Sequence, residues 1–324
     1  MDYNVLGKTG LNVSSLSFGA SSLGNVFRPI DEAEGIRAVH AALDAGINYF
    51  DVAPAYGGTV AETVLGKALR DVSRDRYYLS TKAGKYTAPG AYGEDDLDYT
   101  ERRIRAELQE SMRRLGTDYV DILHLHDFEY QGFSKTELAF SEGFPALSAL
   151  KNEGLIGSVS AGIYPMDLWQ RVVQEVPVDA IMVHNHYSLI DTRGLELVTD
   201  CRAKDIGIIS ASPFGCGLLT GGSPPAWHPA NEQVRAVATL AARFCVEHGT
   251  SIAKLALQFS SQNTFFPTTM FSTARSESVL RNVAWHAEPI DQDLLAEVRT
   301  ILAPVIDKQW DFDAGIDRMK AGSS

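Results

Sequence analysis

The chain has 324 residues, of which 45% are hydrophobic and 22% charged, a composition typical of a globular protein with a large core. Its 29 basic and 41 acidic residues give a net charge of −12 without a dense lysine and arginine stripe, which disfavours a nucleic-acid partner because phosphates need cations. Three widely spaced cysteines, with neither a secretory leader nor an apolar stretch of membrane-spanning length, lead us to expect a reduced cytoplasmic protein.

Strand-like and helix-like segments alternate along the chain. A short strand over 14–19 is followed by a helix that begins at the capping residue Asp31 and ends at Gly46. The alternation continues through further strands at 47–51, 77–81, 120–126, 158–162, 180–184, 207–212 and 265–271. Helical patterns follow nearly all of them, at 60–69, 100–115, 144–152, 166–175, 192–204 and 231–262, the last broken near Gly249.

The eight strands predict a closed α/β barrel. Strands separated by helices run parallel, and eight such units close naturally into a (β/α)8 TIM barrel, which we expect to form a single domain over 1–324. The segment Gly7-Lys8-Thr9-Gly10 predicts the turn of an N-terminal β-hairpin. A doubly wound open sheet is the alternative, but no Gly-x-Gly-x-x-Gly run follows the first strand.

Four residues with proton chemistry lie at or just past predicted strand ends. Asp51, Lys82 and His126 end three strands, and Tyr56 follows the first of these. The active site of such a barrel lies at these ends. A phenol is a poor acid or base at neutral pH, but a nearby ammonium group lowers its pKa, and a carboxylate would hold that ammonium group in place. The set suits proton transfer coupled to carbonyl–alcohol interconversion.

Other interpretations of these residues remain open. Each of the four also fits an ordinary role as a helix cap, a rim aromatic or a solvated strand end. His124 lies on the same strand face as His126 by alternation, so the pattern does not choose between them. The pairs His124-Leu125-His126 and His184-Asn185-His186 also fit a zinc hydrolase, although Lys82 would repel the cation. A third possibility is a regulatory subunit that binds a cofactor without catalysis.

Several segments resemble those of the aldo-keto reductase superfamily. Segments 48–57, 80–82 and 122–126 resemble its catalytic signatures, and 7–11, 13–16, 62–66 and 212–220 match as well. Segments 207–213, 224–230 and 254–258 are similar to the aldose 1-dehydrogenase and L-galactose dehydrogenase group within it. The resemblance implies an NAD(P)-dependent oxidoreductase without a metal. It assigns Tyr56 as general acid–base, Lys82 as the residue that tunes it, Asp51 as the partner of Lys82, and His126 rather than His124 as the catalytic histidine.

The resemblance also implies a set of cofactor contacts. Small residues let backbone N–H groups approach phosphate, and the matching pyrophosphate loop comprises Ser212, Phe214, Gly217 and Leu218. Arg275 and Asn282 fall at the adenosine end, and Ser160 and His184 at the nicotinamide end. The nicotinamide positions depart from the family pattern at Gly162, Ile163, His184 and Ala211. Arg275 could either pair with the 2′-phosphate of NADP or be exposed to solvent at the start of a helix. We expect NAD in preference to NADP.

The expected reaction is oxidation of an aldose at its anomeric hydroxyl. L-galactose, L-fucose or a related cyclic hemiacetal is the implied substrate, and reduction of an aldehyde is the alternative within the same superfamily. Trp227 and His228 lie on a barrel-top loop where an aromatic ring can stack on a sugar, so we expect them to bind substrate together with Tyr56 and His126. Loops 85–98, 127–133 and 221–229 are expected to determine which substrate binds. We expect a monomer or small homo-oligomer with no nucleic-acid or membrane partner.

Overall fold

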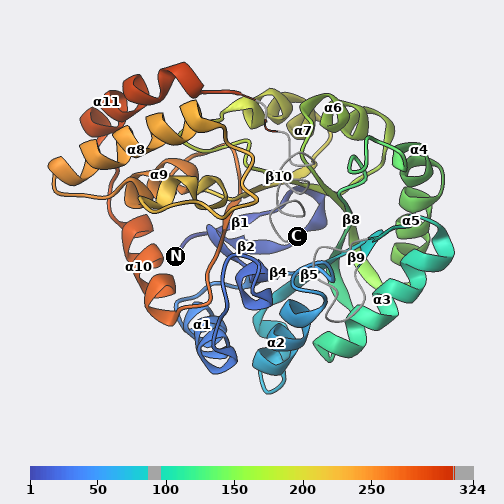
Figure 1. Cartoon of the computed structure of the whole chain (residues 1–324). Helices are drawn as coiled ribbons and strands as arrows, with labels where there is room; N and C mark the ends of the chain where they lie inside the picture. Colours follow the sequence, from blue (N-terminus) through green and yellow to red (C-terminus); the bar gives the residue numbers. More distant parts are fainter. Residues whose placement is uncertain (87–95, 309, 311–324) are drawn as a thin grey trace, which may run out of the picture.

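The computed structural model of the protein describes residues 1–86, 96–308 and 310. Eight parallel strands close into a barrel in which sequence neighbours pair and the last strand pairs with the first, confirming the predicted (β/α)8 fold. Helices form an outer ring around the strands (Figure 1). The barrel strands are β3 (Leu16–Gly19), β4 (Tyr49–Asp51), β5 (Tyr78–Ala83), β8 (Val120–His126), β9 (Ile156–Ile163), β10 (Ala180–His184), β11 (Gly207–Ala211) and β12 (Thr268–Ser272).

Five of the α-helices in the described ranges begin at side chains that cap their free N–H groups. Asp31, Thr100, Asn231, Ser251 and Asp291 each accept a backbone hydrogen bond at a helix start. The α-helices are α1 (Glu32–Asp44), α2 (Val60–Leu69), α3 (Glu101–Leu115), α4 (Thr136–Leu138), α5 (Phe144–Asn152), α6 (Met166–Glu175), α7 (Val198–Ala203), α8 (Glu232–Glu247), α9 (Ile252–Ser261), α10 (Ser276–Ala287) and α11 (Gln292–Leu302).

Two local predictions were wrong, and one segment forms helical turns that were not predicted. The helix expected over 192–204 is a 3-10 turn, Arg193–Leu197, followed by the short α7. The last barrel strand begins three residues later than expected, because the Asn263 side chain accepts hydrogen bonds from the N–H groups of Phe265 and Phe266 and holds them in a turn. Before α5, the chain forms α4 and a π-helical turn, Ala139–Gly143, that the pattern did not indicate.

The predicted N-terminal hairpin closes the N-terminal end of the barrel. Strands β1 (Tyr3–Val5) and β2 (Asn12–Ser14) pair antiparallel around a 3-10 turn, Gly7–Thr9. The Lys8 N–H donates to the Asp205 carbonyl, 2.7 Å away, just before β11. Leu6 is fully buried and packs with residues of the barrel interior. The hairpin therefore leaves the opposite end of the barrel for the active site.

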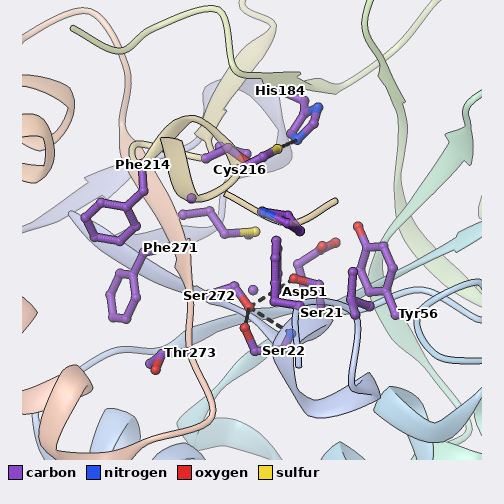
Figure 2. A pocket seen from close by; sticks show the side chains of 18 of the residues that line it. Ser21, Ser22, Asp51, Tyr56, His184, Phe214, Cys216, Phe271, Ser272 and Thr273 are labelled. Atoms are coloured by element: carbon purple, nitrogen blue, oxygen red, sulfur yellow. Dashed lines mark hydrogen bonds between the residues drawn. The ribbon is translucent and has the colours of Figure 1, made fainter. Parts of the chain in front are cut away.

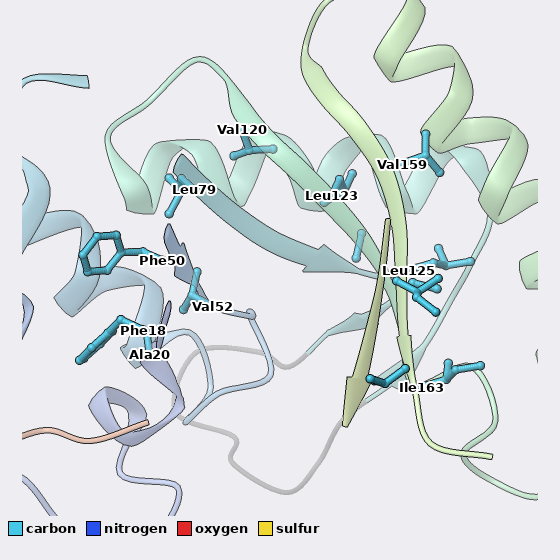
Figure 3. Packing of buried hydrophobic residues seen from close by; sticks show 14 of the residues in the cluster. Phe18, Ala20, Phe50, Val52, Leu79, Val120, Leu123, Leu125, Val159 and Ile163 are labelled. Atoms are coloured by element: carbon cyan, nitrogen blue, oxygen red, sulfur yellow. The ribbon is translucent and has the colours of Figure 1, made fainter. Parts of the chain in front are cut away.

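Alternation along β8 sends its side chains to two different environments. Leu123 and Leu125 join the main apolar cluster between barrel and helices, and Figure 3 shows both on the side of Val159 of β9. Ile122 packs in the barrel interior. Because residues alternate in direction along a strand, His124 and His126 share the interior side with Ile122.

No helix in the described ranges is long and apolar enough to cross a membrane.

Candidate active site

A cavity of about 1280 Å³ lies at the C-terminal ends of the barrel strands. Asp51, Tyr56, Lys82 and His126 all line it, so the structure brings the four predicted catalytic residues to one place. Figure 2 shows Asp51 and Tyr56 facing the same space as His184 and Cys216. The cavity also extends to Arg275, at the start of α10.

Asp51 and Lys82 form an ion pair that is almost fully buried. The Lys82 Nζ donates to the Asp51 carboxylate and to the Val52 carbonyl, the latter 3.0 Å away. The second carboxylate oxygen accepts from the Ser80 hydroxyl at 2.7 Å, since the register of β4 and β5 sets Asp51 beside Ser80. Burial raises the pKa of Asp51 while the Lys82 charge opposes the rise. The pair therefore fixes the ammonium group at the cavity floor.

Close backbone contact positions Tyr56. Gly57 has φ +66°, and a Cβ there would lie 1.9 Å from the Gly24 carbonyl oxygen, so only glycine fits. The turn carries the Tyr56 ring to a centroid distance of 5.1 Å from the Lys82 Nζ and 6.0 Å from the His126 ring. The phenol, the ammonium group and the imidazole thus share one end of the cavity.

The expectation that the ammonium group lowers the pKa of the phenol was wrong for the protein alone. Burial raises the pKa of Tyr56 well above 10, and the charges of Asp51 and Asp127 raise it further. The Asp51 carboxylate, paired with Lys82, offsets the ammonium charge at the phenol. Tyr56 is therefore a neutral phenol near neutral pH, which suits a proton donor.

The cavity distinguishes between the two histidines of β8. His126 lines the cavity, whereas His124 is fully buried outside the lining, with its Nε2 3.5 Å from an Asp51 oxygen. Burial lowers the pKa of His126 to about 3, so its imidazole is uncharged at neutral pH. Its Nδ1 has no hydrogen-bond partner among the described residues. His126 is thus the histidine that can reach a bound oxygen.

A buried carboxyl supports the turn that follows Lys82. Glu107 of α3 is fully buried, and one of its oxygens accepts from the Gly84 N–H at 2.7 Å. The other oxygen has no partner among the described residues. Burial raises the pKa of Glu107 from 4.5 to about 8, so the neutral form is favoured in the folded protein.

Glu107 is expected to make stability fall as the pH rises from about 4.5 to about 8. The folded state holds this proton more tightly than the unfolded chain, so the free energy of unfolding drops by up to about 1.4 kcal/mol per pH unit in that window. Glu107→Gln keeps an oxygen that accepts from the Gly84 N–H but has no titrating proton. The variant should therefore lose this pH dependence of the free energy of unfolding. Urea unfolding of both proteins across the window measures the difference, and parallel stability curves would contradict the assignment.

Most predicted cofactor residues line the cavity away from Tyr56. Ser212, Phe214, Gly217, Arg275 and Asn282 are all in its wall. Leu218 is not; it packs in the apolar cluster beneath α8. The backbone has positive φ at Ser212, Gly215, Cys216 and Gly217. Gly217 lines the cavity without a side chain and so leaves room for a phosphate group beside the backbone of this loop.

Of the five residues expected at the nicotinamide end, four line the cavity and one does not. His184 lines the cavity, with its Nε2 3.5 Å from the Cys216 Sγ (Figure 2) and a pKa that burial lowers to about 4. Gly162, Ile163 and Ala211 line it as well. Ser160 does not; it is fully buried.

The two predicted sugar-binding residues of the 221–229 loop lie in different places. Trp227 lines the cavity, and its indole N–H donates to the Val26 carbonyl 3.4 Å away. His228 is fully buried outside the lining, where its ring nitrogens contact the Gly215 carbonyl and the Ala230 N–H. His228 therefore braces this loop, and Trp227 alone of the two reaches the cavity.

The four histidines considered for zinc do not converge. His186 directs its Nδ1 toward Asp191 and its Nε2 toward the Tyr164 carbonyl. In the described part of the chain, no group of three or more His, Cys, Asp or Glu side chains is arranged to hold a metal ion.

Three polar residues beside the catalytic end were not singled out in the sequence. Lys85, Asp127 and Glu129 line the cavity next to His126. Loops 85–98 and 127–133 were expected to shape this region, and residues 87–95 lie outside the described ranges. Asp127 directly follows a histidine at a strand end, so its position beside the site could have been predicted from the sequence. Nothing in the sequence around Glu129 indicates that its side chain is buried.

Comparison with known proteins identifies the family to which the chain is similar. A family model described as "Aldo/keto reductase family" matches residues 15–303. L-galactose dehydrogenase from Arabidopsis thaliana is 39% identical over 319 residues, spanning 96% of this chain and 97% of that protein. D-threo-aldose 1-dehydrogenase from Pseudomonas sp is 32% identical, spanning 91% and 97%. The holo form of aldo-keto reductase AKR11C1 from Bacillus halodurans superposes with a TM-score of 0.78 at 25% identity, covering 97% of this chain and 99% of that one.

Proposed function

This chain belongs to the aldo/keto reductase family and is an oxidoreductase, and from that premise we propose that it oxidises the anomeric hydroxyl of an aldose to a lactone with NAD as hydride acceptor. The observation that carries the proposal is the common cavity of Tyr56, Lys82, Asp51 and His126. The similarity to two aldose dehydrogenases over more than nine-tenths of the chain supports the sugar substrate.

In this proposal each of the four residues has its own role in one proton transfer. In the direction of oxidation Tyr56 acts as the phenolate and takes the proton of the anomeric hydroxyl, and the neutral His126 imidazole donates a hydrogen bond to the same oxygen. Lys82, held by Asp51, supplies positive charge beside the phenol as negative charge develops there. The buried walls hold the reacting groups in place and limit access of water.

The residues of the cavity wall fit a nicotinamide dinucleotide. The loop of Ser212, Phe214 and Gly217, which lines the cavity, would hold its pyrophosphate, and Arg275 and Asn282 its adenosine end. When bound, the oxidised cofactor supplies the hydride acceptor, together with a positive charge that lowers the pKa of a neighbouring phenol.

A carboxylate at the adenosine end supports NAD over NADP. The N-terminus of α10 is the kind of place where a phosphate binds, but Glu34 of α1 already accepts hydrogen bonds there from the Ser276 N–H at 2.9 Å and the Ser276 hydroxyl at 2.8 Å. These bonds and Arg37 lower the pKa of Glu34 to about 2, so it is ionised. Its negative charge would repel a 2′-phosphate beside Arg275.

Glu34→Ala is expected to shift cofactor preference toward NADPH. Removal of the carboxylate frees the Ser276 donors, and the ratio of the NADPH to NADH dissociation constants should fall by about tenfold. Fluorescence titration of each reduced cofactor measures this without turnover. The matched control is Glu32→Ala, which removes an exposed carboxylate of the same helix turn that pairs with Lys67. An unchanged ratio in Glu34→Ala would contradict the role.

A second function, reduction of an aldehyde, is favoured by one observation. The raised pKa of Tyr56 keeps its proton on the phenol, which is the form that donates to a carbonyl oxygen. A spectrophotometric screen that follows reduced nicotinamide tests both directions with aldoses, aldehydes and hemiacetals against NAD and NADP. NADH formation with L-galactose or a related aldose is the expected result, and no response from any pair would contradict the proposed function.

A further inference from the structure

One wall of the cavity beside the catalytic end is unusually polar for a buried surface. Lys85 of the two-residue strand β6 (Lys85–Tyr86) and Asp127, directly after β8, form an ion pair with Nζ and Oδ2 2.8 Å apart. The Lys85 ammonium also lies 4.0 Å from the centroid of the Tyr130 ring. Both residues line the cavity together with Tyr56 and His126.

Glu129 completes this wall and has a buried oxygen that its surroundings do not satisfy. The residue lines the cavity yet is only 7% exposed. Its Oε1 accepts from the Tyr164 N–H at 2.8 Å, whereas its Oε2 has no hydrogen-bond partner within the described residues. Leaving a buried polar atom unpaired costs free energy, so such an atom in the wall of a cavity points to a ligand that supplies the missing bond.

The charge states of the two acidic residues differ. Burial and the neighbouring Asp127 raise the pKa of Glu129 well above its ordinary value, which favours the protonated carboxyl, a form that can both donate and accept. Burial opposes ionisation of Asp127, but His126 and Lys85 outweigh it and lower its pKa, so it remains a carboxylate. A neutral acid, a carboxylate and an ammonium group side by side offer donors and acceptors together, as neighbouring hydroxyl groups require.

We propose that Glu129, with Asp127 beside it, binds the hydroxyl groups of the sugar beyond its anomeric carbon and thereby restricts the site to polyhydroxylated substrates. The proposal rests on the proposed function, because it assumes that the anomeric carbon faces Tyr56. A site built to hydrogen-bond a hydroxyl group rejects an analogue that lacks it, because its own polar groups are then left unpaired. Glu129 is thus a specificity residue, while Tyr56 and His126 handle the reacting oxygen.

The test compares Glu129→Leu with the unmodified protein on three probes: L-galactose, its monodeoxy analogues, and butanal, which has no hydroxyl groups. We expect the unmodified protein to discriminate against at least one deoxy analogue by about tenfold or more in kcat/KM. Glu129→Leu should lose about tenfold or more with L-galactose and lose that discrimination. Its reduction of butanal should be equal to or higher than that of the unmodified protein, because leucine leaves no polar group unpaired against this substrate, and its dissociation constant for NADH should remain unchanged.

Two further variants separate this role from general damage. Glu129→Gln keeps hydrogen-bonding capacity and should retain more of the L-galactose activity than Glu129→Leu. Glu142→Leu makes the same substitution at an exposed glutamate outside the cavity lining and should leave every probe unaffected. Equal losses on L-galactose and butanal, or discrimination that persists in Glu129→Leu, would overturn the proposal.

Calorimetric titration of L-galactose into the NADH complex makes the result independent of turnover. If the unmodified protein binds L-galactose without oxidising it, the proposed function fails, while weaker binding by Glu129→Leu still supports the subsite. If the unmodified protein oxidises L-galactose and Glu129→Leu binds it equally well, the subsite fails and the proposed function stands. If L-galactose does not bind at all, the subsite proposal is overturned.

Discussion

Tyr56→Phe is expected to lower turnover by about a hundredfold or more in both reaction directions. The substitution keeps the aromatic ring and its contacts with Lys82 and His126 but removes the one hydroxyl that exchanges a proton with the substrate. Since the loss lies in proton transfer, kcat should fall while the dissociation constant for NADH stays unchanged. Steady-state kinetics with fluorescence titration of NADH measures both.

Tyr187→Phe is the matched control for this variant. Tyr187 is a buried tyrosine that stacks on Phe259 among the barrel helices and does not line the cavity. Its variant should keep nearly full turnover. Unchanged turnover of Tyr56→Phe with every active substrate would contradict the assignment of Tyr56 as the acid–base.

Lys82→Met should damage both catalysis and stability. The methionine fills the space of the lysine stem but leaves the Asp51 carboxylate buried, with the Ser80 hydroxyl as its remaining side-chain partner among the hydrogen bonds described. Breaking a buried ion pair in this way lowers the free energy of unfolding by about 3–5 kcal/mol. Because burial then raises the pKa of Asp51 without opposition from Lys82, this deficit should grow as the pH rises. Turnover should fall by about a hundredfold as well.

The double variant Asp51→Asn/Lys82→Met separates the two effects. It removes both charges, so most of the lost free energy of unfolding should return. Turnover should stay low, because the ammonium beside the phenol is still missing. Urea unfolding and steady-state kinetics on the same preparations provide the comparison. A double variant that regains turnover would contradict a catalytic role for the ammonium group.

Strand alternation and strand ends were sufficient to predict the barrel and its catalytic end. Asp51, Lys82 and His126 could be placed together because carboxyl ends of parallel strands meet at one end of a barrel, and the structure brings them together. The choice between His124 and His126 could not come from alternation, which treats them alike. It required the depth of the cavity, which only the packed barrel defines. The family similarity indicated His126 for a separate reason.

The residues missed in the sequence depend on contacts between distant segments. Glu34 is an ordinary first-turn glutamate in α1 until it meets Ser276, 242 positions away in the chain. Glu129 follows a strand end as a polar loop residue, and its burial results from a tight reversal that begins at Asp127, where φ is +48°. The phenol pKa was misjudged for a similar reason, since burial in the packed barrel and the charges of Asp51 and Asp127 raise it.

The central claim is that hydride leaves the anomeric carbon of an aldose for the nicotinamide while Tyr56 takes the hydroxyl proton. Its most direct test is the turnover of L-galactose labelled with deuterium at the anomeric carbon, followed by mass spectrometry of the NADH formed. The account predicts one deuterium in each NADH molecule. NADH without deuterium, or a lactone that keeps the label, would contradict it.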